Sequence, residues 1–413
     1  MRHNGRDAEA TRWTRYHVTY ELVIVGGGLA GASLAACMAR AGARVLVLER
    51  TEQFRDRVRG EGMHPWGVPE LQVLGLYRKL KETCAHEARY WRTYRGSTLT
   101  RERDLMETTP QRAAAVDFFH PRMQEIVLAE ALEAGAEVRR GATVLKVTGG
   151  GGPVVTAWVD GKETDFPARL VVGADGRQSV VRREGAFEVR RDQDWLRITG
   201  ALFEGMPAPE SAVHVFVAPS FGHASLLFPI GGRRYRVYFT TGRRNEHRTL
   251  SGARDIADFS NYCTQTGVPQ EWFDRARLVG PLATFEGADV WVDHPYKSGI
   301  VLVGDAAAAN DPSFGCGLSL TLRDVRVLRD ALLDIEDWDA ACHRYADEHD
   351  RYYGALHRIT SWLRQVRYAV GADADRVRER ALQSLADGSG RDLIGQGPDY
   401  PADEHAQARF LDA

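Results

Sequence analysis

The alternation of apolar and polar positions divides the chain into segments of three kinds. Short unbroken apolar runs, such as residues 22–25 and 45–48, are typical of strands that are buried on both faces of a parallel sheet. Residues 195–241 alternate apolar and polar positions between glycine turns, which predicts an antiparallel sheet with one face covered. Apolar side chains that recur at steps of three and four from Tyr345 to Val370 predict a long amphipathic helix packed on the body of the protein.

A glycine-rich turn follows the first apolar run. Gly26, Gly28 and Gly31 have the spacing G-x-G-x-x-G, a helical pattern follows them, and the second apolar run ends at Glu49. In such a unit the first glycine permits a tight turn, the second lets the backbone approach a pyrophosphate, and the third lets the helix pack close to the sheet. The helix N-terminus favours phosphates, and the acid can accept hydrogen bonds from ribose hydroxyls. This order of elements predicts dinucleotide binding; the alternative is a turn that serves only helix packing.

Composition narrows the class of protein. Of the 413 residues 27% are charged and 44% are hydrophobic, which is typical of a globular protein. The net charge of −2 gives no general attraction to nucleic acid or to anionic membranes. No apolar run approaches the length of a membrane span, and the first twenty residues lack the apolar core of a signal peptide. The five cysteines form no C-x-x-C pair, which argues against a zinc site or a disulfide framework, so we expect a cytoplasmic protein without a metal.

Two further glycine-and-acid motifs lie far along the chain, GADGRQSVVR at 173–182 and GDAAAANDPSFGCG at 304–317. Together with the first motif they form a combination that resembles the FAD-dependent aromatic hydroxylases of the para-hydroxybenzoate hydroxylase family, the group A flavoprotein monooxygenases. The resemblance extends to about residue 335. It is specific to the wider family and not to one substrate.

The resemblance implies FAD as cofactor and assigns positions to it. Asp175 and Gly176 match a motif that supports the pyrophosphate region, although Asp175 could instead cap the following turn. Asp305 matches the acid that binds the ribityl chain, and Pro312 matches the proline over the reactive edge of the flavin. The cofactor-binding residues that we expect are Gly26, Gly28, Gly31, Glu49, Arg50, Arg59, Arg122, Gln124, Asp175, Gly176, Gly304, Asp305, Gly315 and Gly317.

The expected fold is α/β, with a Rossmann-type FAD-binding domain, an inserted antiparallel β-sheet substrate domain and a C-terminal helical region. Residues 87–119 read as strands that could form part of a roof over the substrate. The predicted boundaries are an extension at 1–20, the FAD-binding domain at 21–184 with a roof insertion at about 63–120, the substrate-binding sheet at 185–285, the second part of the FAD-binding domain at 286–335, and helices and tail at 336–413.

The resemblance implies hydroxylation of an aromatic or polyketide-like small molecule through a flavin C4a-hydroperoxide, as in secondary metabolism. O₂ is the co-substrate, and NADPH or NADH is the transient reductant. The absence of a second G-x-G-x-x-G also leaves room for a partner flavin reductase. A base that deprotonates a phenol would make its ring more nucleophilic. We expect Pro312, His223 and Tyr238 as catalytic residues, with His214 and His64 as further candidates for the base.

Two other functions stay open. One is a flavin-dependent halogenase or a prenyl-chain reductase of the same superfamily; the halogenase signature W-x-W-x-I-P is absent, and no lysine lies near Trp66. The other is a flavin-binding regulator without turnover. The chain also departs from many relatives, which have a histidine near Ala308 and an asparagine near Ser319. Cys316 in the third motif could contact a substrate, or it could only pack.

Overall fold

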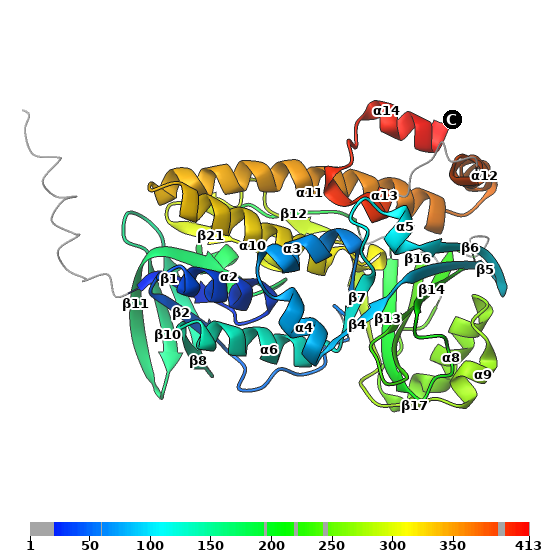
Figure 1. The fold of residues 1–413 in the computed structure, drawn as a ribbon, viewed down its shortest axis with the longest axis horizontal. Helices are drawn as coiled ribbons and strands as arrows, with labels where there is room; N and C mark the ends of the chain where they lie inside the picture. Colours follow the sequence, from blue (N-terminus) through cyan, green and yellow to red (C-terminus); the bar gives the residue numbers. More distant parts are fainter. Residues whose placement is uncertain are drawn as a thin grey trace, which may run out of the picture.

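The chain forms two large sheets that lie beside each other, and one long helix runs across both (Figure 1). The computed structural model describes residues 20–412, apart from residues 59, 194–195, 219–221, 243–246 and 387–392. The extension predicted at 1–20 therefore lies almost wholly outside the described residues. Within the described part of the chain, no helix is long and apolar enough to cross a membrane.

The first sheet has a parallel centre. Its strands lie in the order β20, β21, β11, β1, β2, β8, and they pair in parallel from β21 to β8. All five residues of β2 are buried, as its unbroken apolar run predicts. The strands in this order are Tyr296–Lys297, Ile300–Leu302, Lys162–Gly173, Tyr20–Val25, Val45–Glu49 and Glu137–Arg140; β9 (Thr143–Thr148) and β10 (Val154–Val159) extend β11 as an antiparallel ribbon.

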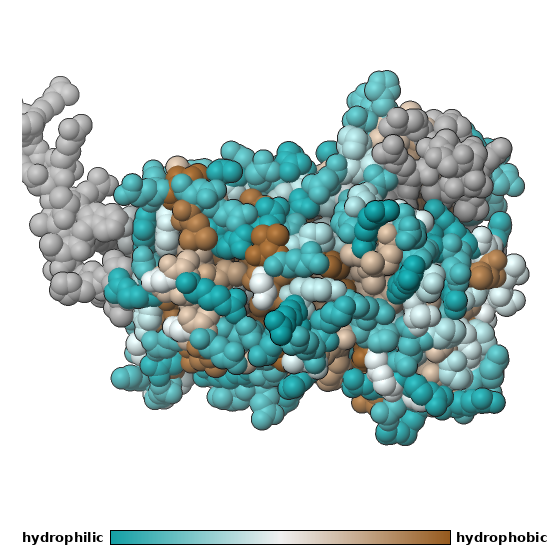
Figure 2. Space-filling view, viewed as in Figure 1, coloured by the Kyte–Doolittle hydropathy of each residue, from teal (hydrophilic) through white to brown (hydrophobic). Residues whose placement is uncertain are grey.

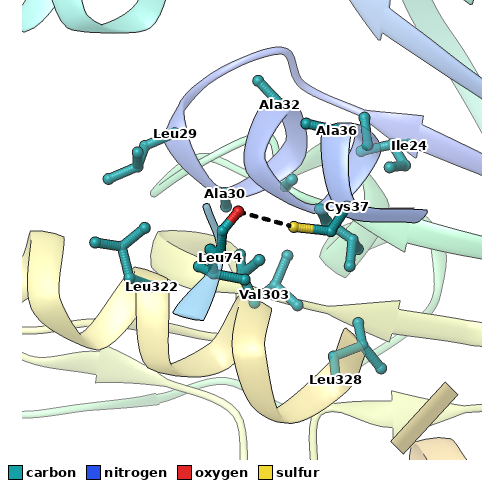
Figure 3. Close-up of a cluster of buried hydrophobic side chains, with 14 of the residues drawn as sticks. Ile24, Leu29, Ala30, Ala32, Ala36, Cys37, Leu74, Val303, Leu322 and Leu328 are labelled. Carbon is teal, nitrogen blue, oxygen red and sulfur yellow. Dashed lines mark hydrogen bonds between the residues drawn. The ribbon is translucent and has the colours of Figure 1, made fainter. Parts of the chain in front are cut away.

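Three helices cover one face of this sheet, namely α2 (Leu29–Arg40), α6 (His120–Glu133) and α10 (Gly317–Asp334). Figure 3 shows Ala30 and Cys37 of α2 on the side of the helix that faces Leu322 and Leu328 of α10, and the Cys37 thiol donates to the carbonyl of Leu74 at 3.6 Å. Burial raises the pKa of the Cys37 thiol. The small side chains of α2 let this helix pack close to both the sheet and α10, which fixes the position of its N-terminus.

The second sheet is antiparallel except where β14 meets β5. Its strands are β17 (Arg277–Leu278), β13 (Leu196–Glu204), β16 (Arg234–Gly242), β15 (His223–Pro229), β14 (Ala212–Ala218), β5 (Tyr90–Arg95) and β6 (Thr98–Asp104), with β18 (Ala283–Gly287) also on β13. Strands β5 and β6 come from the predicted roof segment 87–119 and extend this sheet. The α/β fold class with an inserted antiparallel sheet is confirmed.

The expectation that this sheet has one covered face is wrong for β15, where all seven residues are buried. One face packs on α8 (Ile256–Gln265) and α9 (Gln270–Asp274) through residues such as Phe239. The other face, where Leu226 and Phe228 lie, turns toward the half of the molecule that holds the parallel sheet. Both faces of β15 are covered, so the alternation of apolar and polar residues in its sequence does not mark a solvent-exposed face.

Smaller sheets and helices join the two halves. Strands β3 (Gly62–Met63), β7 (Ala115–Phe118) and β4 (Ala85–Ala88) form one sheet, and β12 (Arg190–Arg191), β19 (Val290–Trp291) and β22 (Ala308–Ala309) form another. The remaining helices include α3 (Val68–Val73), α4 (Tyr77–Thr83), α5 (Leu105–Thr108), α7 (Val180–Glu184), α12 (Ala372–Ala386), α13 (Leu393–Gln396) and α14 (Glu404–Gln407).

The long amphipathic helix is confirmed as α11 (Trp338–Tyr368), which crosses above both sheets (Figure 1). Tyr345, Tyr352 and Ile359 of its apolar stripe are buried. Val370 is an exception, because it lies beyond the end of the helix and is 53% exposed. Helix α11 therefore contacts the body over most of its length.

Candidate functional site

A cavity of about 800 Å³ lies where the two sheets meet. All three glycine-and-acid motifs contribute to its wall, although they are separated by more than a hundred residues along the chain. The predicted site residues that line it are Gly26, Gly28, Glu49, Arg50, Gln124, Asp175, Gly176, Tyr238, Asp305, Pro312, Gly315 and Gly317. The structure therefore brings most of the predicted site residues to one place.

The first motif forms a backbone cradle at the N-terminus of α2. Gly26 has φ of +104°, and a Cβ there would lie 2.4 Å from the carbonyl oxygen of Ala174, so only glycine fits. A Cβ on Gly31 would lie 1.9 Å from the carbonyl oxygen of Gly26. Gly28 precedes the helix and provides no side-chain cap, which leaves the first N–H groups available. These features fit a bound pyrophosphate.

Glu49 stands at the end of β2 and is held in place by three hydrogen bonds. One oxygen accepts from the Gly27 amide at 2.7 Å, and the other accepts from the amide and the hydroxyl of Thr51 at 2.9 and 2.8 Å. A carboxylate has roughly four lone-pair sites. Glu49 therefore keeps capacity for a further donor on the cavity side, which suits a ribose hydroxyl.

Asp175 binds the first amides of helix α7, whose N-cap residue is Ser179. Its carboxylate accepts from the Ser179 hydroxyl at 2.5 Å and from the amides of Val180 and Val181 at 2.6 and 3.2 Å. Burial raises its pKa. The capping role that the sequence left open is thus present, and Asp175 also lines the cavity, so its contact with the cofactor remains a prediction.

The third motif places a rigid loop across the cavity. Asp311 Oδ1 accepts from the amide and hydroxyl of Ser313 at 2.9 and 2.7 Å, which fixes the turn that begins at Pro312. Gly315 adopts a left-handed conformation with φ of +68°, and α10 begins at Gly317 without a side-chain cap. A helix N-terminus that opens on the cavity can stabilise negative charge on a bound ring system.

His64 supports this loop from behind. Its Nε2 lies 2.6 Å from the carbonyl oxygen of Phe314, and its ring stacks on Trp91 at 5.3 Å. Burial lowers the pKa of His64 to about 4, so the neutral ring donates its proton to that carbonyl. This donation fixes the loop, and His64 is not among the residues that line the cavity.

The second sheet supplies the opposite wall. Its cavity residues are Ile198, Leu226, Phe228, Tyr238, Thr240 and Phe285. Alternation along the strands decides this set: Leu226 and Phe228 face the cavity, whereas Leu227 packs under α8 with Phe239. This wall is mostly apolar, which suits an aromatic ligand and excludes water.

Some predicted site residues lie elsewhere. His223 is not among the cavity residues; its ring packs against Phe239 and His247 at 5.4 and 4.4 Å, and burial lowers its pKa to about 4. His214 contacts Tyr94, with Nδ1 3.2 Å from the tyrosine hydroxyl, on the helix-covered face. Position on the opposite strand face separates both histidines from the cavity.

The other predicted cofactor residues support the cavity wall, lie away from the cavity, or fall outside the described residues. Gly31 and Gly304 pack behind the wall; Gly304 has φ of +61°, and its amide donates to Asp324 at 2.7 Å. Arg122 is exposed on α6 and does not line the cavity. Arg59 lies outside the described residues. Cys316 is buried, with its thiol donating to the Phe314 carbonyl at 3.5 Å, so it packs behind the loop.

An ion-pair cluster that the sequence analysis missed ties α11 to the loop at Pro312. Arg364 lies 3.0 Å from Asp289, 3.4 Å from Asp192 and 3.4 Å from Asp311. Burial, with Asp311 nearby, raises the pKa of Asp289 to about 6. Asp192, Asp289 and His357 have the chemistry of metal ligands, but the guanidinium of Arg364 already supplies the cation that these carboxylates need.

Three comparisons place this geometry among known proteins. A family model described as "FAD binding domain" matches residues 19–346. Mouse squalene monooxygenase is 27% identical over 329 residues, which are 77% of this chain and 55% of that protein. The 6-methylpretetramide 4-monooxygenase of Streptomyces rimosus is 27% identical over 334 residues, which are 74% of this chain and 73% of that protein. The chain thus spans little more than half the length of the squalene monooxygenase.

Solved structures match over almost the whole chain. A p-nitrophenol 4-monooxygenase from Pseudomonas putida has a TM-score of 0.77 at 17% identity and covers 95% of this chain and 98% of that one. A flavin-dependent brominase has a TM-score of 0.74 at 18% identity and covers 95% and 97%. At this identity the likeness concerns the fold alone.

Proposed function

Because the chain belongs to the FAD-binding-domain family, we propose that it is an FAD-dependent monooxygenase that hydroxylates an aromatic or polyketide-like small molecule. The observation that carries this proposal is the meeting of three motifs and an apolar sheet wall at one cavity. We further propose NADPH or NADH as transient reductant, with a partner flavin reductase as the other source of electrons, and a role in secondary metabolism. The five free cysteines support a cytoplasmic location.

Bound FAD would supply the redox chemistry that transfers one oxygen atom from O₂ to the substrate. The chain's own residues bind and orient it. The N-terminus of α2 at Gly28 would hold the pyrophosphate, Glu49 a ribose hydroxyl, and Asp305 the ribityl chain. The amides at Gly315 and Gly317 would meet the pyrimidine end of the ring.

The opposite wall would position the substrate and keep water away from the reacting atoms. Leu226, Phe228 and Phe285 form an apolar surface there, and Pro312 closes the loop side. Glu61 and Tyr238 both line the cavity, and the Tyr238 hydroxyl can accept a proton from a bound phenol as it passes its own proton to Glu61. His223 stays a weaker candidate for this role because it lies on the other strand face.

The first experiment is reconstitution with FAD, followed by absorbance spectroscopy of the desalted protein. We expect a bound flavin spectrum; a colourless protein that does not take up FAD would contradict the proposal. NADPH consumption is then measured with and without an aromatic compound, under air and under nitrogen. A monooxygenase transfers labelled oxygen from ¹⁸O₂ to its product. Turnover under nitrogen indicates a reductase, and a product that forms only with bromide indicates a halogenase. FAD binding without oxidation of NADPH or NADH indicates a regulator.

A further inference from the structure

We propose that the sheet wall of the cavity selects aromatic molecules that present a neutral hydrogen-bond donor, such as a phenolic hydroxyl, and rejects those that present a carboxylate there. This inference rests on the proposed function, since it takes the cavity to hold an aromatic substrate. It names the class of that substrate from the hydrogen bonds and charges of the described residues.

The first argument concerns the protons of the wall's hydroxyl groups. The Tyr238 hydroxyl donates to the carboxylate of Glu61. Thr240 donates to the carbonyl of Ala224 at 3.1 Å, and its oxygen also lies 2.9 Å from the hydroxyl of Tyr368. A hydroxyl has one proton, so each of these oxygens can only accept from a ligand.

Two side chains on the loop side follow the same rule. Ser313 donates its hydroxyl proton to Asp311 at 2.7 Å. Asn310 donates from Nδ2 to Asp289 at 2.8 Å, and its Oδ1 has no hydrogen-bond partner among the described residues. Both residues line the cavity. A ligand hydroxyl finds acceptors here, whereas a carboxylate, which only accepts, finds no hydroxyl proton available.

The second argument concerns charge behind the wall. Arg236 is fully buried, and two carboxylates neutralise it: Glu61 at 3.0 Å from Nε and Asp56 at 2.7 Å from Nη2. One cation against two anions leaves one negative charge. Of these three side chains, only Glu61 lines the cavity. A ligand carboxylate at this wall would therefore meet a like charge in a low-dielectric region.

Asp117 adds to this effect. It is fully buried beside the wall, and neither of its oxygens has a hydrogen-bond partner among the described residues. Burial, with Glu61 nearby, raises its pKa well above the ordinary value, so the neutral acid is favoured. The same surroundings that hold Asp117 neutral would oppose an ionised carboxylate on the ligand.

The strands of the wall do not themselves carry the cationic residues of the cavity. These residues lie in two segments, residues 50–57 and 177–191, and not on strands β13, β15 or β16 of the wall; Arg177 and Arg191 reach Glu286 at the edge strand β18. Their charge suits the phosphates of a cofactor.

Three probes with one ring system test this inference: 2-naphthol has a donor, 2-methoxynaphthalene has neither donor nor charge, and 2-naphthoate has a carboxylate. Their dissociation constants for the FAD-loaded protein are measured at pH 7 by titration calorimetry. We expect 2-naphthol to bind about tenfold more tightly than each of the others, because one added hydrogen bond and one avoided like charge each change affinity to this extent. Equal or tighter binding of 2-naphthoate, or no binding of 2-naphthol, would overturn the inference.

Variants locate the effect. Tyr238→Phe should weaken 2-naphthol several-fold and leave 2-methoxynaphthalene unchanged. Tyr94→Phe is the matched control, because the Tyr94 hydroxyl lies 3.2 Å from His214 on the other face of the sheet and should change neither affinity. Equal loss for both probes in Tyr238→Phe would mean a packing role and would contradict the donor argument. Where Tyr238→Phe does not fold, Thr240→Val gives the same comparison.

The two proposals fail in different ways. Selective binding of 2-naphthol without O₂-dependent hydroxylation of any aromatic would overturn the proposed function and support the selectivity of the wall. Hydroxylation together with preferred binding of 2-naphthoate would overturn the selectivity alone.

Discussion

Replacing Arg364 with leucine should destabilise the folded protein, because it removes the cation from a buried cluster of carboxylates. Asp289 and Asp311 are both fully buried and lie 3.0 and 3.4 Å from the guanidinium. Removing one partner from a buried ion pair leaves an uncompensated charge and costs about 3–5 kcal/mol. We expect Arg364→Leu to lower the free energy of unfolding by this amount at pH 7, and to weaken FAD binding because Asp311 holds the turn at Pro312.

The assay is urea unfolding followed by circular dichroism, with Arg351→Ala as the control. Arg351 lies on the same helix and pairs with Glu348 at 2.8 Å, but these side chains are 56% and 44% exposed, so its loss should cost less than about 1 kcal/mol. The cost of Arg364→Leu should be smaller at pH 5, where Asp289, with its pKa raised to about 6, is largely protonated and needs no cation. An effect of Arg364→Leu no larger than that of Arg351→Ala would refute the reasoning.

Three other predictions concern single residues. Gly31→Ala should abolish FAD binding and lower the free energy of unfolding by about 1–3 kcal/mol, since its Cβ would lie 1.9 Å from the Gly26 carbonyl oxygen; wild-type affinity in an FAD titration would contradict this. His64→Leu leaves the buried Phe314 carbonyl without its donor and should lower the free energy of unfolding in urea by about 1–3 kcal/mol. An unchanged free energy of unfolding would contradict this. Burial lowers the pKa of His214 to about 4, so on acidification the unfolded chain binds a proton at this histidine before the folded protein does. The free energy of unfolding should therefore fall by about 1.4 kcal/mol for each pH unit as the pH is lowered from 6.5 to 4. His214→Gln should make this fall shallower, and an unchanged slope would contradict the prediction.

The unit from β1 to Glu49 could be predicted from the sequence because its signals are local. A strand, a glycine turn and a helix follow one another within thirty residues, and each glycine answers a steric need that the structure makes explicit at Gly26 and Gly31. The meeting of three distant motifs was implied only by the family resemblance. Their convergence on one cavity depends on how the sheet is ordered, which no single segment determines.

The substrate side was harder to predict because it depends on strand faces and distant pairs. His223 and Tyr238 were equal candidates from sequence, yet only Tyr238 shares a face with Leu226, its partner across the sheet. Side chains two positions apart on a strand share a face, so His223 lies on the same face as Leu227, which packs under the helices. This assignment needs the face of one residue of the strand to be known first. Glu61 and Tyr238 are 177 residues apart, and Arg364 meets Asp192 across 172, so local patterns did not indicate either cluster.

The late position of β21 in the chain has a consequence for biosynthesis. Strands β1, β2, β8 and β11 can pair as soon as residue 173 has been made, but their sheet receives β21 only at residues 300–302, after the entire antiparallel sheet. The loop with Pro312 follows still later. During most of its synthesis the nascent chain therefore lacks β21 and the loop at Pro312. The whole FAD site can form only once about three quarters of the polypeptide has been made. Supply of FAD at the end of synthesis, rather than at its beginning, is what should limit the yield of active protein.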